Sequence, residues 1–193
     1  MRNVLTPLTL VVLAFPLGAG AQARGPTDKG SMLVAGTATI QRSTFEVGDN
    51  ESTSTGVAIS PTILFFVAPR FAIGGQLGLS RVNFEEGNSS SWLLGPAARI
   101  YFGESSSKTL PFVGASFSIG GSSTESDDSD DESGSDTWAL EGVAGITWMV
   151  SRQVGITGEA YVQRTEFEND GFDIEQTRTD LGIRFGFAAF LFR

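Results

Sequence analysis

The 193-residue sequence contains no cysteine and no histidine. Without cysteine there is no disulfide and no thiolate, and without histidine neither Ser-His nor Cys-His nucleophile systems can form. Beyond the N-terminal region no apolar run approaches 18 residues, which argues against a membrane-spanning helix. No 3.6-residue periodicity persists there either, so the pattern predicts strands. We therefore expect no enzyme, and the sequence indicates no cofactor site.

The first 23 residues have the features of a secretory signal peptide. Arg2 is the charged start, an apolar stretch runs from Val4 to Leu17, and Ala21-Gln22-Ala23 offers a small-residue cleavage site. We predict a signal peptide over residues 1–23 and one domain over residues 24–193.

Two segments carry aromatic residues ten positions apart on one face. Trp138 and Trp148 end one segment, and Trp92 and Phe102 end the other. Ten residues of tilted strand climb roughly 25 Å, which is the height of the apolar band on an outer-membrane barrel, and aromatic girdles mark both edges of that band. A sandwich strand with two core tryptophans would also fit the first segment alone. The repeated pattern favours the barrel.

Eight segments alternate in the period of two that strands require. The last is the clearest, with Leu181, Ile183 and Phe185 on one face and Gly182 and Arg184 on the other. The sequence thus predicts an all-β fold, an eight-stranded antiparallel up-and-down transmembrane β-barrel, with lipid outside and a packed polar interior. The expected strands are 31–42, 55–67, 71–84, 91–102, 111–121, 137–149, 153–167 and 177–192.

The connections alternate between short and long, as they do in such barrels, where the longer ones are external. Most of the 22 acidic residues lie in the four longer connections, and seven of them lie in the third loop, from Ser122 to Asp136. The net charge of −9 argues against nucleic acid as a partner. Asp128, Asp130 and Glu132 have the alternate spacing of calcium ligands but lack the rest of an EF-hand loop, so a solvated acidic tip is the competing interpretation.

Four charged residues fall on the interior face of the predicted strands: Arg99, Glu141, Glu159 and Arg184. Buried charges must be paired. We predict that Glu159 pairs with Arg184 and that Arg99 joins Glu159 or Glu141. This network would either plug the narrow lumen or gate a small pore.

Three arginines, Arg42, Arg81 and Arg164, take the outward phase at the external ends of their strands. Arginine suits bidentate contact with phosphate, so these residues are candidates for binding lipopolysaccharide. The alternative is that these three are ordinary charged residues above the apolar band. Pro61 and Pro96 interrupt two strands, and we expect local bulges there.

Three stretches together resemble the outer-membrane protein β-barrel domain family: Ile59 to Ser80, Trp92 to Phe102 and Pro111 to Phe117. The resemblance implies an OmpA/OmpX-like small barrel of a Gram-negative bacterium. Such barrels usually end on an outward aromatic residue read by the barrel-assembly machinery. Here Phe192 falls on the inward phase, so that signal would be read from Phe187 and Leu191 or restored by a bulge.

Three functions are compatible with these patterns. The first is a non-enzymatic outer-membrane barrel, structural or surface-interacting, which presents acidic extracellular loops. The second is a small-solute channel gated by the interior arginines and glutamates. The third is a secreted soluble barrel that binds a ligand inside. For the first we expect a monomer with both termini in the periplasm, in contact with lipid and lipopolysaccharide.

Overall fold

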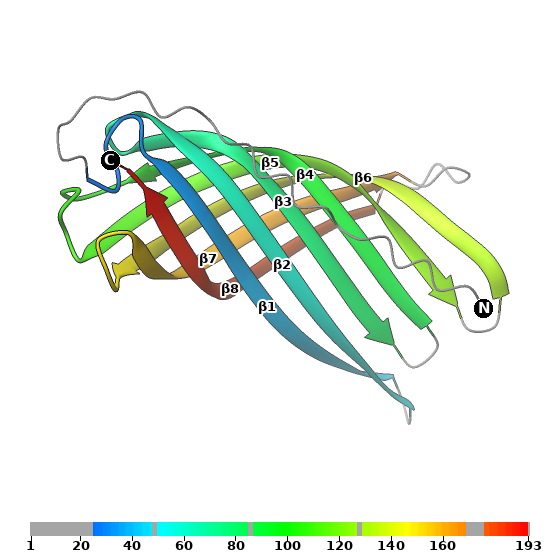
Figure 1. Ribbon diagram of the computed structural model, residues 1–193. Helices are drawn as coiled ribbons and strands as arrows, with labels where there is room; N and C mark the ends of the chain where they lie inside the picture. The colour runs from blue at the N-terminus through cyan, green and yellow to red at the C-terminus, as the bar shows by residue number, and fades with distance from the viewer. Residues whose placement is uncertain (1–24, 48–49, 85–86, 127–128, 169–175, 193) are drawn as a thin grey trace.

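The computed structural model describes residues 25–47, 50–84, 87–126, 129–168 and 176–192, and the side chains of 25–40, 55–83, 87–123, 135–166 and 177–192. The predicted signal peptide lies outside these residues. Eight strands form a closed barrel in which each pairs with the next and β8 pairs with β1 (Figure 1). This confirms the predicted all-β barrel. Among the described residues no helix is both long and apolar enough to cross a bilayer.

Most strands extend further than predicted at one end of the barrel, whereas β3 has the predicted bounds. Their bounds are β1 Met32–Val47, β2 Asn50–Ala68, β3 Phe71–Phe84, β4 Gly87–Tyr101, β5 Thr109–Ser126, β6 Ser129–Met149, β7 Val154–Glu168 and β8 Gln176–Leu191.

Side chains alternate between the lumen and the outer surface along every strand. In β6 Leu140 and Ile146 are exposed on the outside, whereas Glu141 and Thr147 are buried inside. The alternation follows from the pleat, which turns successive Cβ atoms to opposite faces. The predicted division of residues between lumen and exterior holds over the described side chains of β6.

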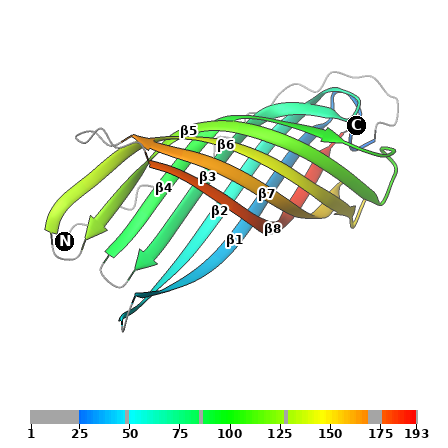
Figure 2. The same cartoon turned by 180° about the vertical axis from the view of Figure 1, so that it is seen from behind.

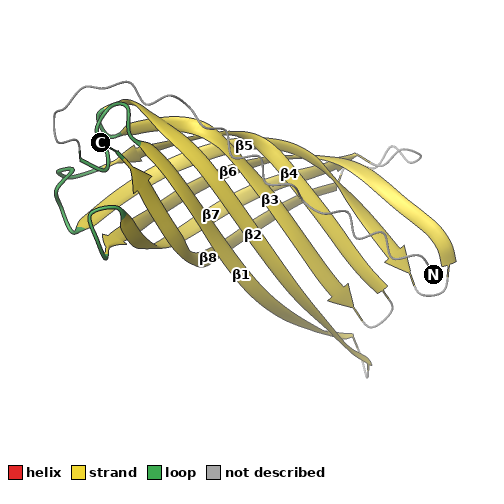
Figure 3. Cartoon of the chain, in the orientation of Figure 1, coloured by secondary structure: helices red, strands yellow, loops and turns green. Residues whose placement is uncertain are grey.

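The two ends of the barrel differ (Figure 3). Residues 25–31, the short connections 69–70, 102–108 and 150–153, and the end of β8 lie at one end, which we call the turn end. The opposite end, the hairpin end, carries the β1–β2, β3–β4, β5–β6 and β7–β8 connections. Figure 2 shows from behind that β8 lies between β7 and β1.

Strand pairing at the hairpin end corrects the predicted loop bounds. The third loop was expected from Ser122 to Asp136, but β5 continues to Ser126 and β6 begins at Ser129. Pairing proceeds through this segment, and the Ser122 and Ser135 hydroxyls lie 2.8 Å apart. Polar residues can continue a two-stranded ribbon into water because the ladder satisfies the backbone. The acidic segment is therefore mostly hairpin rather than loop.

The expected bulges at Pro61 and Pro96 are absent. Pairing of β2 with β3 skips two residues between Ile59 and Thr62 and resumes in the same register. Pairing of β4 with β5 likewise resumes unchanged at Ala97 after Leu94. A proline lacks an N–H to donate, so the ladder loses local bonds on one side while the other side keeps the strand aligned. The register shifts lie elsewhere, at 66–68 and 124–126.

The N-terminal segment, residues 25–31, folds over the turn end. The Thr27 amide donates to Ser105 Oγ at 3.1 Å, and its carbonyl accepts from the Arg70 amide at 2.7 Å. Arg70 holds a left-handed backbone conformation, with φ of 67°, in the turn between β2 and β3. Thr27 and Ser31 are almost fully buried. This segment is a hook that ties two turns of the barrel together.

Candidate functional site in the barrel lumen

Four strands bring the interior charges to one level of the lumen. Arg99 comes from β4, Glu141 from β6, Glu159 from β7 and Arg184 from β8. Glu159 and Arg184 are register partners of adjacent strands, so their side chains leave the sheet side by side. All four residues are at least 94% buried.

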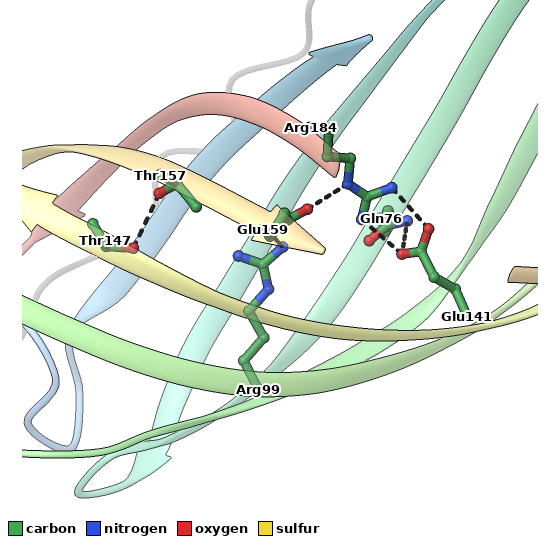
Figure 4. Close-up of polar contacts among 7 residues, drawn as sticks. All are labelled: Gln76, Arg99, Glu141, Thr147, Thr157, Glu159 and Arg184. Atoms are coloured by element: carbon green, nitrogen blue, oxygen red, sulfur yellow. Dashed lines mark hydrogen bonds and ion pairs between the residues drawn. The ribbon is translucent and has the colours of Figure 1, made fainter. Parts of the chain in front are cut away.

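The four charges form one connected cluster, which we call the ion cluster (Figure 4). Arg184 donates to both Glu141 carboxylate oxygens at 2.8 Å and, through Nε, to Glu159. Arg99 Nη2 lies 3.3 Å from Glu159 Oε2. The predicted pair of Glu159 with Arg184 is present, and Arg99 joins Glu159 rather than Glu141.

Charge balance makes this cluster tolerable in the buried interior of the barrel. Two arginines face two glutamates, and a bidentate guanidinium–carboxylate pair is among the strongest polar contacts in proteins. Gln76 Nε2 donates to Glu141 Oε1 at 3.3 Å. The ring of Tyr161 lies under Arg184, with 4.8 Å between the guanidinium carbon and the ring centroid. By these contacts, removing Arg184 would leave the buried Glu141 without its charged partner, and removing Glu159 would do the same to Arg99.

Below the ion cluster, toward the turn end, the lumen holds a dry core that the sequence analysis missed. Phe66, Tyr101, Phe112 and Phe190 pack ring to ring, with centroids 5.3 to 6.4 Å apart. We call this group the aromatic core. Leucines and alanines complete it: Leu33, Leu64, Leu110, Ala35, Ala72, Ala97 and Ala188. The lower half of the lumen is thus filled with apolar side chains.

Above the ion cluster the lumen opens into a polar cavity of about 230 Å³, which we call the vestibule. Hydroxyl and amide side chains line it, with Arg184 and Glu141 among the lining groups; others include Thr39, Ser60, Gln76, Ser116, Ser118 and Gln163. Arg178 and Asp180 also line this cavity and pair at 2.8 Å. The vestibule can hold water or a small polar solute, and the ion cluster and aromatic core close the path beneath it.

Two glycines make room for the largest interior polar groups. Gly145 is the register partner of Glu159, and Gly182 is that of Tyr161. A Cβ at Gly145 would lie 2.7 Å from the Glu159 Cβ and from Phe112 Cζ, and one at Gly182 would lie 2.8 Å from the Tyr161 ring. Such contacts are shorter than real Cβ atoms accept. At both positions a large interior side chain thus lies opposite a glycine of the neighbouring strand.

The four predicted girdle residues lie on the outer surface. Trp92, Phe102 and Trp148 are 51%, 48% and 49% exposed. Trp138 is half-buried and packs against Phe117, with ring centroids 6.2 Å apart. Trp92 and Trp138 lie toward the hairpin end, and Phe102 and Trp148 toward the turn end.

The other predicted site residues are spread over the hairpin end. Arg81 and Arg164 are exposed on the outward phase, and Arg164 pairs with Glu166 at 2.8 Å. The Arg42 side chain and the candidate calcium ligands Asp128, Asp130 and Glu132 lie outside the described side chains. The structure therefore brings the ion cluster together and leaves the other candidates as predictions.

The sequence matches no protein-family model and no curated protein. Among solved structures, Neisserial surface protein A shares 15% identity over 83% of this chain and 97% of its own, with a TM-score of 0.53. Two proteins of Pseudomonas aeruginosa also match. The N-terminal β-barrel domain of OprF has 12% identity over 87% and 100% of the two chains, TM-score 0.45. OprG has 11% identity over 87% and 99%, TM-score 0.49. The chain therefore has the fold of the small outer-membrane barrels, as its resemblance predicted.

Proposed function

We propose that this chain is a non-enzymatic integral barrel of the bacterial outer membrane that presents acidic hairpins at the cell surface. One observation carries the proposal: large apolar side chains cover the outside while the charges lie within. On β8, Leu181, Ile183, Phe185 and Phe187 are 65% to 82% exposed, whereas Arg184 is buried. A water-soluble barrel would have the opposite arrangement, so this pattern also argues against a secreted ligand carrier.

The direct test places arginine on each face of the barrel. An arginine near the midplane of the lipid face costs about 2–4 kcal/mol, while lumen positions tolerate polarity. Ile146→Arg and Phe185→Arg should therefore reduce the heat-modifiable, outer-membrane-fractionated barrel, as judged by gel migration of boiled and unboiled membranes. Equal losses from a lumen arginine would contradict the proposal.

The matched lumen control needs room for the new side chain. Thr147 is a poor choice because it is fully buried and its hydroxyl lies 3.0 Å from that of Thr157. Gln163 lines the vestibule and is the register partner of Asp180. Gln163→Arg should therefore insert almost normally.

A closed lumen favours a structural or surface role over the channel alternative. A solute would have to cross both the ion cluster and the aromatic core, and an eight-stranded lumen is only wide enough for side chains. The purified barrel should give no conductance steps in planar bilayers. Arg184→Ala should give none either, because the aromatic core stays in place. Conductance steps whose size changes in the Arg184→Ala variant would instead support the channel.

We extend the proposal to orientation and partners. The hairpin end faces outward, both termini lie in the periplasm, and the barrel is a monomer. Exposed Phe187 and Leu191 present the terminal signal to the assembly machinery, since Phe192 packs against the aromatic core. Protease added to intact cells should cut an epitope placed in residues 169–175 but not one placed in residues 150–153.

Arg42, Arg81 and Arg164 remain the proposed contacts for lipopolysaccharide phosphates. Arg81 is the stronger member of the described pair because Arg164 already binds Glu166. Arg81→Ala combined with Arg164→Ala should lower the lipopolysaccharide that co-purifies with the barrel. Unchanged co-purification would remove this part of the proposal.

The acidic β5–β6 hairpin supports, at most, weak divalent binding at Asp128, Asp130 and Glu132. Calorimetry with millimolar calcium tests it directly. Heat that disappears when these three residues become Asn, Asn and Gln would support a site, and no heat would leave the hairpin as a solvated acidic surface.

A further inference from the structure

A groove lies on the outer surface of β4, β5 and β6 at the hairpin end, beside Trp92. Its lining includes Trp92, the serines Ser90 and Ser123, Gly121 and Asp136. These residues come from neighbouring positions of the sheet: Trp92 pairs with Gly121 and Gly121 with Asp136, while Ser90 pairs with Ser123 one step higher.

Gly121 forms the floor of this groove. A Cβ built on it would lie 3.5 Å from Trp92 Nε1, so the indole lies directly alongside the bare backbone. Trp92 is 51% exposed and presents that ring to the surroundings. The Ser90 and Ser123 hydroxyls lie 3.1 Å apart above it, and the exposed Asp136 follows on the next strand. An aromatic plane thus adjoins two hydroxyls and a carboxylate.

This combination matches one ligand chemistry well. A pyranose ring has an apolar C–H face, which packs on an aromatic plane, and an edge of hydroxyls. Serine hydroxyls both donate and accept hydrogen bonds, and an ionised carboxylate accepts them. We propose that the groove formed by Trp92, Ser90, Ser123, Gly121 and Asp136 binds a pyranose ring.

The other girdle tryptophan of similar exposure lacks these neighbours. Trp148 is 49% exposed at the turn end, where its register partners are Thr109 and Ile156. No carboxylate stands beside it among those partners. Trp148 therefore serves as a matched control: it has the same side chain and similar exposure, without a carboxylate or a pair of hydroxyls among its register partners.

The sugar could belong to a glycolipid headgroup of the surrounding leaflet or to a free oligosaccharide. Arg81 is the register partner of Ser90, so a phosphate on the sugar would meet a guanidinium. This inference goes beyond the proposed function, and only the glycolipid source rests on the proposed position of the hairpin end. Two probes separate the sources: lipopolysaccharide, and the soluble oligosaccharide released from it by mild acid.

The experiment measures binding of each probe to the purified barrel in detergent micelles by saturation-transfer NMR on the sugar-ring protons. Trp92→Ala should weaken binding about tenfold, whereas Trp148→Ala should change it less than about twofold. Gly121→Val should also abolish binding, because a Cβ there already lies 3.5 Å from Trp92 Nε1 and the two added methyl groups would fill the groove. Ala115→Val, exposed on the same strand, is its control.

The outcomes distinguish the proposals. Loss with both Trp92→Ala and Gly121→Val supports the site, and the probe that binds identifies the source. Failure of both probes to bind the wild-type barrel, or equal binding by all four variants, overturns the site. Heat-modifiable migration verifies that each variant is folded. A folded barrel that fractionates with the outer membrane yet binds neither probe would refute this inference and leave the proposed function standing.

Discussion

The two halves of the lumen use different means to fill the same narrow space. At the turn end, Phe66, Phe112 and Phe190 pack with aliphatic side chains into a water-free core. At the hairpin end, hydroxyls and amides line a cavity of about 230 Å³. The ion cluster lies between them. Identical side chains placed in the two halves should therefore have unequal effects on stability, and unfolding in urea can measure the difference.

The largest expected effect comes from breaking the ion cluster. Arg184→Met preserves length but leaves Glu141 and Glu159 buried without their shared partner. We expect a loss of about 3–5 kcal/mol in the free energy of unfolding, measured by urea titration in lipid vesicles. Arg178→Met is the control on the same strand, since its pair with Asp180 is largely exposed and should contribute about 0–1 kcal/mol. Similar losses from both would show that burial does not matter here.

Two leucines compare the halves directly. Leu64 is fully buried in the aromatic core, whereas Leu93 is half-buried and lines the vestibule. Leu64→Ala should cost about 2–5 kcal/mol in the same titration, since it opens a cavity among packed neighbours. Leu93→Ala should cost less than about half of that because water can enter the space. If Leu93→Ala proves as costly, the vestibule is packed rather than open.

Glycine substitutions sharpen the comparison at the boundary between the halves. Gly145→Ala would drive a methyl group into Glu159 and Phe112, and overpacking of this kind costs about 1–3 kcal/mol. Gly142 faces outward on the same strand, and a Cβ there would lie 3.6 Å from Val162, which is ordinary contact. Gly142→Ala should therefore be nearly neutral. The measurement is the difference in the urea midpoint of unfolding between these two alanine variants.

An effect no larger than that at Gly145 is expected at the buried hydroxyl pair of Thr147 and Thr157, whose oxygens are 3.0 Å apart. Thr157→Val keeps the shape but removes a partner, so the Thr147 hydroxyl loses its bond at a cost of about 1–3 kcal/mol. Replacing both residues with valine should restore part of the loss. A double variant worse than the single would mean that shape, rather than hydrogen bonding, dominates at this position.

Alternation in the sequence was enough to predict the fold and the ion cluster. The period of two assigned Glu141 and Thr147 to the lumen, and it placed Glu159 and Arg184 at matching heights on adjacent strands. Because the pleat leaves no other choice of face, the contact of Arg184 with Glu159 followed from phase and register. The contact of Arg184 with Glu141 was not predicted, because it joins β8 to β6, which are not adjacent strands.

The aromatic core was missed for an identifiable reason. Phe66, Phe112 and Phe190 occupy inward positions close to the short turns, where a barrel interior need not be polar. The interior was treated as uniformly polar, so apolar residues on that phase were not grouped. Reading the inward phase separately for each end of the strands would have found them.

The extent of the hairpins was not predictable from the same signals. Alternation between apolar and polar residues disappears in the sequence of β5 and β6 toward the hairpin end. Serine-rich and acidic segments then have the composition of loops, although cross-strand bonds such as Ser122 to Ser135 continue the ladder. The amino-acid composition of these segments therefore did not predict that their backbone forms paired strands.

The hook at residues 25–31 has a consequence for the order of assembly. Thr27 bonds to Ser105, between β4 and β5, and to Arg70, between β2 and β3. The Arg70 anchor requires β2 and β3, and the Ser105 anchor also requires β4 and β5, although the hook itself is synthesised before all of them. Both contacts of the hook are thus completed late in folding. In hydrogen exchange, the amide proton of Arg70 should be among the first protected protons to exchange when the barrel begins to open.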